Sequence, residues 1–201
     1  MRSYYLIRPA LLVGFCLCVS LVIARMYSDG AAAGRDDVSD FQARIDSYIE
    51  IQRRAMAAVP PISNSVADPA VIIQHESDLA NAIRALRPNA AEGDLFLPGV
   101  REVIVAIVDR QLAGPNGEAV RDTILSEGNP AFHDEDEAAT PVKLIVNRSY
   151  PSAAPLSTMP PSLLLTLPRL PQGLEYRFVG HCLILRDTEA NLIVDVIWNV
   201  F

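Results

Sequence analysis

The densest group of titratable side chains lies at residues 133–137, which read His-Asp-Glu-Asp-Glu. Four carboxylates beside an imidazole could bind a hard cation, because such ions prefer oxygen ligands. A calcium-binding loop, however, spaces its ligands and places a glycine at the turn, whereas positions 138 and 139 are alanine. The pattern is therefore more typical of a solvated acidic loop. In such a loop His133, Asp134 and Asp136 are candidates only for a nonspecific cation site.

His75 and Glu76 begin a pattern seen in zinc-binding helices but do not complete it. That pattern needs a second imidazole one helical turn later, and position 79 is Leu79. We therefore expect His75 to lie at the edge of a buried helix face rather than to bind a metal.

His181 and Cys182 are neighbours and suggest a thiolate–imidazole pair. Successive side chains of a strand point to opposite faces, however, so this pair could not form there. Asp195 could approach Cys182 across a hairpin, but a carboxylate would raise the pKa of the thiol and so would not activate it. The sequence also lacks Gly-x-Ser-x-Gly, and no lysine follows Gly114-Pro-Asn-Gly117 to complete a phosphate loop. We therefore predict no catalytic residue, no cofactor and no specific metal site.

The stretch 173–201, which would position His181 and Cys182, predicts a three-stranded antiparallel meander. Gly180 can close the first turn together with His181, because glycine tolerates the positive φ of tight hairpin turns. This turn sets the register of the first two strands, with the pairs Val179–Cys182, Phe178–Leu183, Tyr176–Leu185 and Glu175–Arg186.

The register divides the meander into two faces of different polarity. The apolar face consists of Leu174, Tyr176, Phe178, Leu183 and Leu185. After a loop at 187–190, the third strand is predicted to return Leu192, Val194, Val196 and Trp198 to the same face. An isolated three-stranded sheet is marginal in water, so helices must cover this face. The opposite face, with a Glu175–Arg186 ion pair, is predicted to carry whatever surface role the protein has.

Three segments of the meander resemble the end of a family of uncharacterised exported bacterial proteins. They are LEYRFVG at 174–180, LILRD at 183–187 and ANLIVD at 190–195. Further similar segments at 60–63, 93–96 and 155–171 extend the resemblance from about Asp37 to the end of the chain. The family has Arg-Asp where this chain has His181-Cys182, so the resemblance gives these two residues no role. It implies export and assigns no activity.

Capping residues and prolines delimit four predicted helices before the meander. Their bounds are Ser39 to the residue before Pro60, Asp68-Pro69 to Arg87, Pro98 to the residue before Gly114, and Asn116 to Ser126. Between them and the meander lies an acidic and proline-rich connector at 129–172. This connector contains one candidate strand at 142–147 and a short helix near 162–167.

Residues 1–33 have the features of an export signal. Arg2 and Arg8 precede an apolar run from Pro9 to Ala24. The small residues at 31–33 favour cleavage, whereas an apolar stretch counted from Tyr4 to Ile23 would reach the length of a membrane anchor. Residues 28–35 are interpreted as a flexible linker. Both alternatives place the rest of the chain outside the inner membrane, in the periplasm or anchored to that membrane.

These elements predict an α+β fold in which an apolar N-terminal helix precedes one exported domain at 37–201. The helical part covers 37–128, the connector 129–172 and the meander 173–201. A formal net charge of −7 argues against nucleic acid as a partner. The leading hypothesis is a non-enzymatic binding or structural module of the bacterial envelope, with a protein or small molecule as its partner. The alternative is an enzyme or metal-handling protein that uses the acidic loop 133–137 and the histidines.

Overall fold

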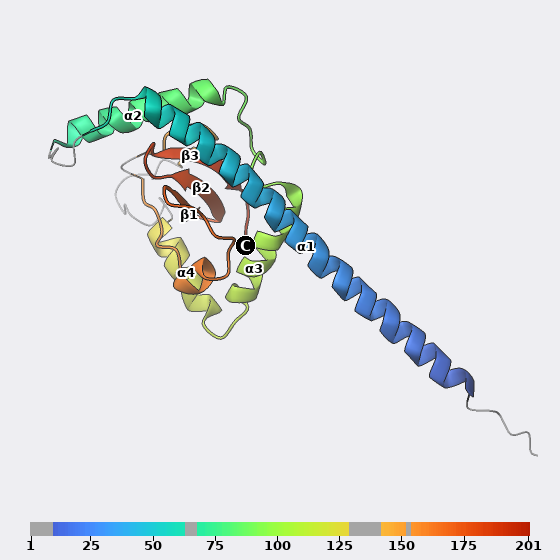
Figure 1. The fold of residues 1–201 in the computed structure, drawn as a ribbon. Helices are drawn as coiled ribbons and strands as arrows, with labels where there is room; N and C mark the ends of the chain where they lie inside the picture. Colours follow the sequence, from blue (N-terminus) through green and yellow to red (C-terminus); the bar gives the residue numbers. More distant parts are fainter. Residues whose placement is uncertain (1–9, 63–67, 129–141, 152–153) are drawn as a thin grey trace, which may run out of the picture.

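The computed structural model describes residues 10–62, 68–128, 142–151 and 154–201, and for residues 10–33 it describes only the helical backbone. It confirms the predicted α+β fold, in which helices are followed by an antiparallel meander (Figure 1). The helices are α1 (Ala10–Ala58), α2 (Pro69–Leu86), α3 (Pro98–Leu112), α4 (Gly117–Gly128) and α5 (Pro161–Leu164). The strands are β1 (Leu174–Val179), β2 (Cys182–Asp187) and β3 (Leu192–Ile197).

Local capping chemistry sets the predicted bounds of α2 and α3. The Asp68 carboxylate accepts a hydrogen bond of 2.9 Å from the backbone N–H of Ala70, and Pro69 occupies the first helical position. The helix ends at Leu86, just before the Arg87-Pro88 pair. Pro98 likewise occupies the first helical position of α3, although no side-chain hydrogen bond caps that helix. These predictions are confirmed because capping depends on short-range contacts that the sequence displays directly.

The start of the first helix was predicted wrongly. Neither a linker at 28–35 nor an N-terminal cap at Ser39 is present, because α1 is continuous from Ala10 to Ala58. Gly30 and Gly34 each disfavour a helix by about 1 kcal/mol relative to alanine. The three alanines between them are the best helix formers, and no proline interrupts the segment.

The predicted signal segment is only partly covered by the structure. Residues 1–9 lie outside the described residues, and the side chains of 10–33 are not described. Among the residues whose side chains the structure describes, which begin at residue 34, no helix has the length and apolar character needed to cross a membrane.

The register of β1 and β2 is the predicted one. Val179 pairs with Cys182, and the pairs continue through Phe178–Leu183 to Glu175–Arg186. Gly180 has a φ of 55°, so the residue type that tolerates this conformation occupies the turn.

A β-bulge between β2 and β3 corrects the predicted placement of the third strand. Leu185 pairs with Asp195, but its neighbour Arg186 pairs with Ile193, so one extra residue is inserted in β3. The bulge shifts the alternation of side chains beyond it. Val196 therefore lies on the opposite face from Leu192, and the predicted face of Trp198 was also wrong, because its side chain leaves the core and is 37% exposed.

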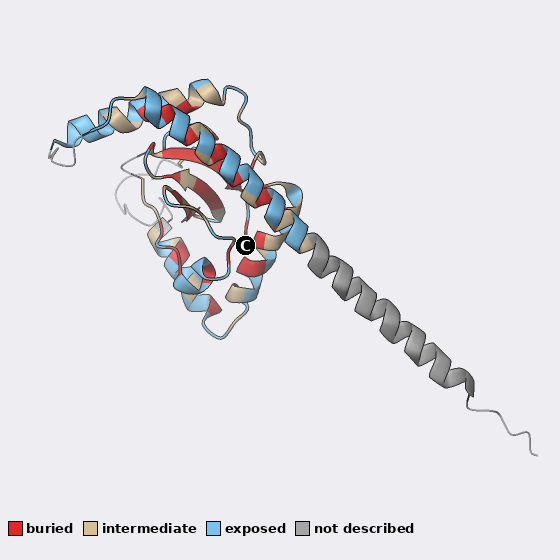
Figure 2. Cartoon of the chain, in the orientation of Figure 1, coloured by how far each residue is buried: buried red, intermediate tan, exposed pale blue. Residues whose placement is uncertain are grey.

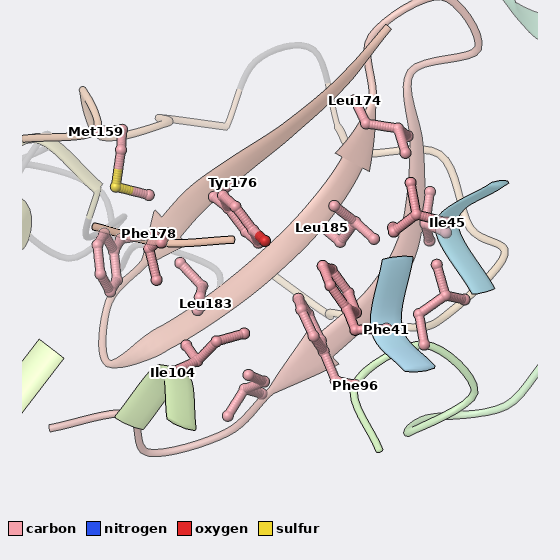
Figure 3. Packing of buried hydrophobic residues seen from close by; sticks show 14 of the residues in the cluster. Phe41, Ile45, Phe96, Ile104, Met159, Leu174, Tyr176, Phe178, Leu183 and Leu185 are labelled. Carbon is pink, nitrogen blue, oxygen red and sulfur yellow. The ribbon is translucent and has the colours of Figure 1, made fainter. Parts of the chain in front are cut away.

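One face of the sheet, which we call the helical face, packs against α1, α3 and the loop before α3 (Figure 3). The ring of Phe96 stacks between those of Phe41 and Tyr176, with centroid distances of 5.8 and 6.4 Å. Phe178 and Leu185 from the strands are fully buried in the same cluster. The predicted apolar face is thus the main core of the protein.

The opposite face, which we call the second face, is covered as well, contrary to the prediction of a surface role. Ile184 and Ile193 are fully buried there beneath Leu144, Val146 and Tyr150. Figure 2 shows this burial along the strands. The predicted strand at 142–147 is not formed; instead an irregular segment, with Asn147 at a φ of 63°, runs beside β3 and makes one isolated bridge from Ser149 to Leu192.

Candidate binding groove

The metal-site candidates from the sequence receive no structural support. His133, Asp134 and Asp136 lie outside the described residues. Among the residues that are described, no three His, Cys, Asp or Glu side chains group so that they could hold a metal ion. His75 is partly exposed on α2, beside a small cleft that also contains Pro60 and Pro61. The metal-handling hypothesis therefore stays a prediction about the acidic loop.

His181 and Cys182 belong to different surroundings. The imidazole of His181 is exposed, with Nδ1 3.0 Å from the carbonyl oxygen of Phe201. Cys182 packs at the margin of the second face, where burial raises the pKa of its thiol despite an opposing backbone hydrogen bond at Asn199. A raised pKa keeps the thiol protonated at neutral pH and makes it a poor nucleophile. Asp195 does not approach it, because that carboxylate points toward the loop before α3.

Asp187, which is fully buried at the end of β2, joins the sheet to α1. Its Oδ2 accepts hydrogen bonds of 2.8 Å from the Tyr48 hydroxyl and from the Gln52 amide. Its Oδ1 accepts the backbone N–H groups of Glu189 and Ala190, each at 2.9 Å. Burial and the charge of Asp187 together hold the pKa of Tyr48 far above its ordinary value. The carboxylate is thus occupied by four donors and acts as a structural tie.

Asp195, also fully buried, fixes the loop that precedes α3. It accepts hydrogen bonds of 2.8–2.9 Å from the N–H groups of Gly93, Leu95 and Phe96, and a further bond from Val196. Burial raises the pKa of its carboxyl, although these four N–H groups oppose the rise. This tie holds the loop at 92–96 beside the end of β3, so it builds one wall of a groove.

The groove has a volume of about 820 Å³ and lies between that loop, α3 and the residues that follow the bulge in β3. We call it the Trp198 groove. Its apolar lining includes Phe96, Val105 and Trp198, and its charged lining includes Glu92, Glu102, Asp109 and Arg101.

Trp198 is held in place although it is partly exposed. Its indole N–H donates a hydrogen bond of 3.0 Å to Glu92, and its carbonyl oxygen lies 3.4 Å from the guanidinium of Arg101. Three features thus position the ring. The bulge in β3 turns Trp198 out of the core, Asp195 fixes the loop at 92–96, and Glu92 in that loop accepts the hydrogen bond from the indole. A fixed, accessible aromatic ring in a mixed groove is suited to non-covalent binding.

Sequence reasoning missed this arrangement because it assigned Trp198 to the core. A signal was nevertheless present, since the segment 192–197 reads Leu-Ile-Val-Asp-Val-Ile without polar alternation. A continuous apolar strand interrupted by one carboxylate indicates burial on both faces and a buried acceptor. The bulge itself has no signal in the local sequence.

No known family model, curated protein or solved structure matches the chain significantly. The function must therefore be inferred from the side chains and surfaces of the chain itself.

Proposed function

We propose that this chain is a non-enzymatic binding module of the bacterial envelope and that it binds its partner in the Trp198 groove. The observation that carries the proposal is Trp198, which remains 37% exposed while its indole is tethered to Glu92. Exposing a large aromatic side chain to water is unfavourable, and tryptophan is enriched among the residues that dominate binding energies. The two buried carboxylates support a binding role over catalysis, because their oxygens already accept hydrogen bonds.

We also propose that the protein is exported and stays tied to the inner membrane. The positive start and apolar run of residues 1–24, and the resemblance to exported proteins, support export. The continuity of α1 supports retention of the N-terminal segment, because the small residues at 31–33 lie within a helix. Proteolytic sites are preferentially exposed and flexible segments, not hydrogen-bonded helices.

Site-directed photo-crosslinking in living cells tests the binding proposal. A photoreactive residue in place of Val105 would sit in the Trp198 groove, and one in place of Asp122 on α4 gives an exposed control elsewhere. We expect a discrete crosslinked adduct from position 105 and none of the same mass from position 122. The absence of an adduct at 105, or the same adduct at both positions, would contradict the proposal.

The location is tested separately by fractionation and by the N-terminus of the mature protein. We expect the intact N-terminal segment in the inner-membrane fraction, with the domain accessible to protease from the periplasmic side. A soluble periplasmic form that begins near residue 34 would contradict the anchor but keep export. A domain protected in the cytoplasm would contradict export.

A further inference from the structure

We infer that the partner of the Trp198 groove is a positively charged polypeptide segment in an extended conformation. This inference rests on the proposed binding function and specifies the chemistry of its partner. It follows from three features of the groove, which are its charge, its exposed indole and the spacing of its carboxylates.

The charge of the lining favours a cationic ligand. Glu92, Glu102 and Asp109 contribute three carboxylates, against the single guanidinium of Arg101. Glu102 and Asp109 are exposed on α3, so their fields reach into solvent and can attract a ligand before contact. The full chain is acidic as well, with a formal net charge of −7, which adds to the attraction at long range.

The exposed indole gives a cation a second favourable contact. Tryptophan is the best aromatic partner for an ammonium or guanidinium group placed over its ring. The hydrogen bond from the indole N–H to Glu92 fixes the ring, while Trp198 as a whole remains 37% exposed. A lysine or arginine side chain lying on Trp198 would also bury its methylene groups against the apolar lining at Val105 and Phe96.

The spacing of the carboxylates favours a chain over a compact cation. Glu102 and Asp109 both line the groove and are separated by about two helical turns, or roughly 10 Å along α3. In an extended polyproline-type peptide, side chains three residues apart are separated by a similar distance of about 9 Å. One extended segment with two basic residues could therefore contact both carboxylates, whereas a single small cation could contact one.

Titration with a short oligolysine peptide tests the inference. Trp198 is the single tryptophan of the sequence, so the intrinsic tryptophan fluorescence of the full chain, kept in an uncharged detergent, reports on the groove alone. We expect a saturable change in the emission that weakens as salt is added, because the exposed charges become screened. An oligoglutamate peptide of equal length should produce no saturable change.

A matched pair of double variants separates the groove from general charge attraction. Glu102→Gln with Asp109→Asn neutralises the groove, and Glu118→Gln with Asp122→Asn removes the same charge from exposed positions on α4. All four residues are exposed, so both variants should fold. We expect oligolysine to bind the groove variant about tenfold more weakly, which corresponds to about 1.4 kcal/mol, and to bind the α4 variant almost as the unchanged protein does.

Three outcomes would overturn the inference. They are the absence of a saturable signal, equal weakening in the two variants, or binding of free spermidine as tight as that of oligolysine. If any of these occurs while the crosslink from position 105 persists, the groove still binds a partner but the partner is not a basic polypeptide. Loss of the crosslink itself would instead contradict the proposed function.

Discussion

Both faces of the sheet contain a buried apolar cluster, but the two clusters are covered by different kinds of structure. On the helical face, Phe178 and Leu185 pack against regular helices and a stacked row of aromatic rings. On the second face, Ile184 and Ile193 are equally inaccessible, yet their cover is an irregular segment that includes Leu144 and Tyr150. This difference shows that a sheet face can form part of a core without packing against a helix. It is sufficient that apolar side chains of another segment cover the face and exclude water.

The irregular cover is held by hydrogen bonds that also close the edge of β3. The N–H of Asn147 donates to the carbonyl of Ile193 at 2.8 Å, and the N–H of Ile193 donates to Arg148 at 2.9 Å. Arg84 of α2 donates to the Asn147 carbonyl at 2.8 Å, which ties the cover to the helices. Its Tyr150 hydroxyl donates to the Pro155 carbonyl, and burial raises the pKa of that hydroxyl to about 12. The edge of β3 around Ile193 is therefore not available for pairing with another chain.

Removing the largest fully buried strand side chain of the helical face should have the greatest effect. Phe178→Ala is expected to lower the free energy of unfolding by about 3–5 kcal/mol, because it removes a fully buried ring that the surrounding helices cannot replace. Urea denaturation followed by circular dichroism would measure this loss. A loss below 1 kcal/mol would show that the helical face is not the main core.

The matching substitution on the second face is Ile184→Ala. A solvent-facing position would tolerate this change, but Ile184 is fully buried, so we expect a loss of roughly 2–5 kcal/mol that is smaller than that of Phe178→Ala. The smaller loss is expected because an irregular cover can collapse into the cavity more easily than packed helices. Urea denaturation of both variants in the same buffer would compare the two losses. A change within 0.5 kcal/mol, typical of surface sites, would contradict the second core.

The comparison of the two faces explains why the sequence predicted the burial of the helical face but not that of the second face. The β1–β2 register followed from Gly180 and from simple alternation, both of which are local. The burial of Ile184 and Ile193 depends on residues 142–151 and 154–156, about 40 positions earlier in the chain, where Asn147 adopts a left-handed conformation. Trp198 was assigned to the wrong face for a related reason. The extra residue of the bulge moves each later side chain of β3 to the opposite face, and the position of a bulge depends on tertiary contacts.

Asp195 lies next to the bulge and accepts hydrogen bonds from the loop before α3. Asp195→Asn would turn an amide donor toward N–H groups that need an acceptor, so we expect the free energy of unfolding to fall by about 1–3 kcal/mol at neutral pH.

The effect of this substitution should also depend on pH. Because burial raises the pKa of the native Asp195 carboxyl, the folded state binds more protons than the unfolded state as the pH falls. The stability advantage of the native protein over the variant should therefore grow between pH 7 and pH 4. Urea denaturation across that range would test it, and an advantage that shrinks on acidification would contradict the raised pKa.

The smallest effect is expected from the ion pair at the margin of the second face. Glu175 lies 2.7 Å from both Arg177 and Arg186, and Arg186 also donates two hydrogen bonds to Asn191. Arg186→Ala leaves Glu175 one of its two partners, so we expect a cost of about 1 kcal/mol at pH 7. Burial tends to raise the pKa of Glu175, but hydrogen bonds from Arg177 and Arg186 outweigh it and lower the pKa below the ordinary value of 4.5. A lowered pKa in the folded state means that this stabilisation is present above pH 4.5 and is lost as the pH falls through the folded-state pKa. The difference in the free energy of unfolding between native protein and variant should consequently shrink on acidification, opposite in sign to the trend expected for Asp195.

If Arg186→Ala instead cost more than Ile184→Ala, the second face would be held mainly by its charged margin, and its apolar cover would be secondary.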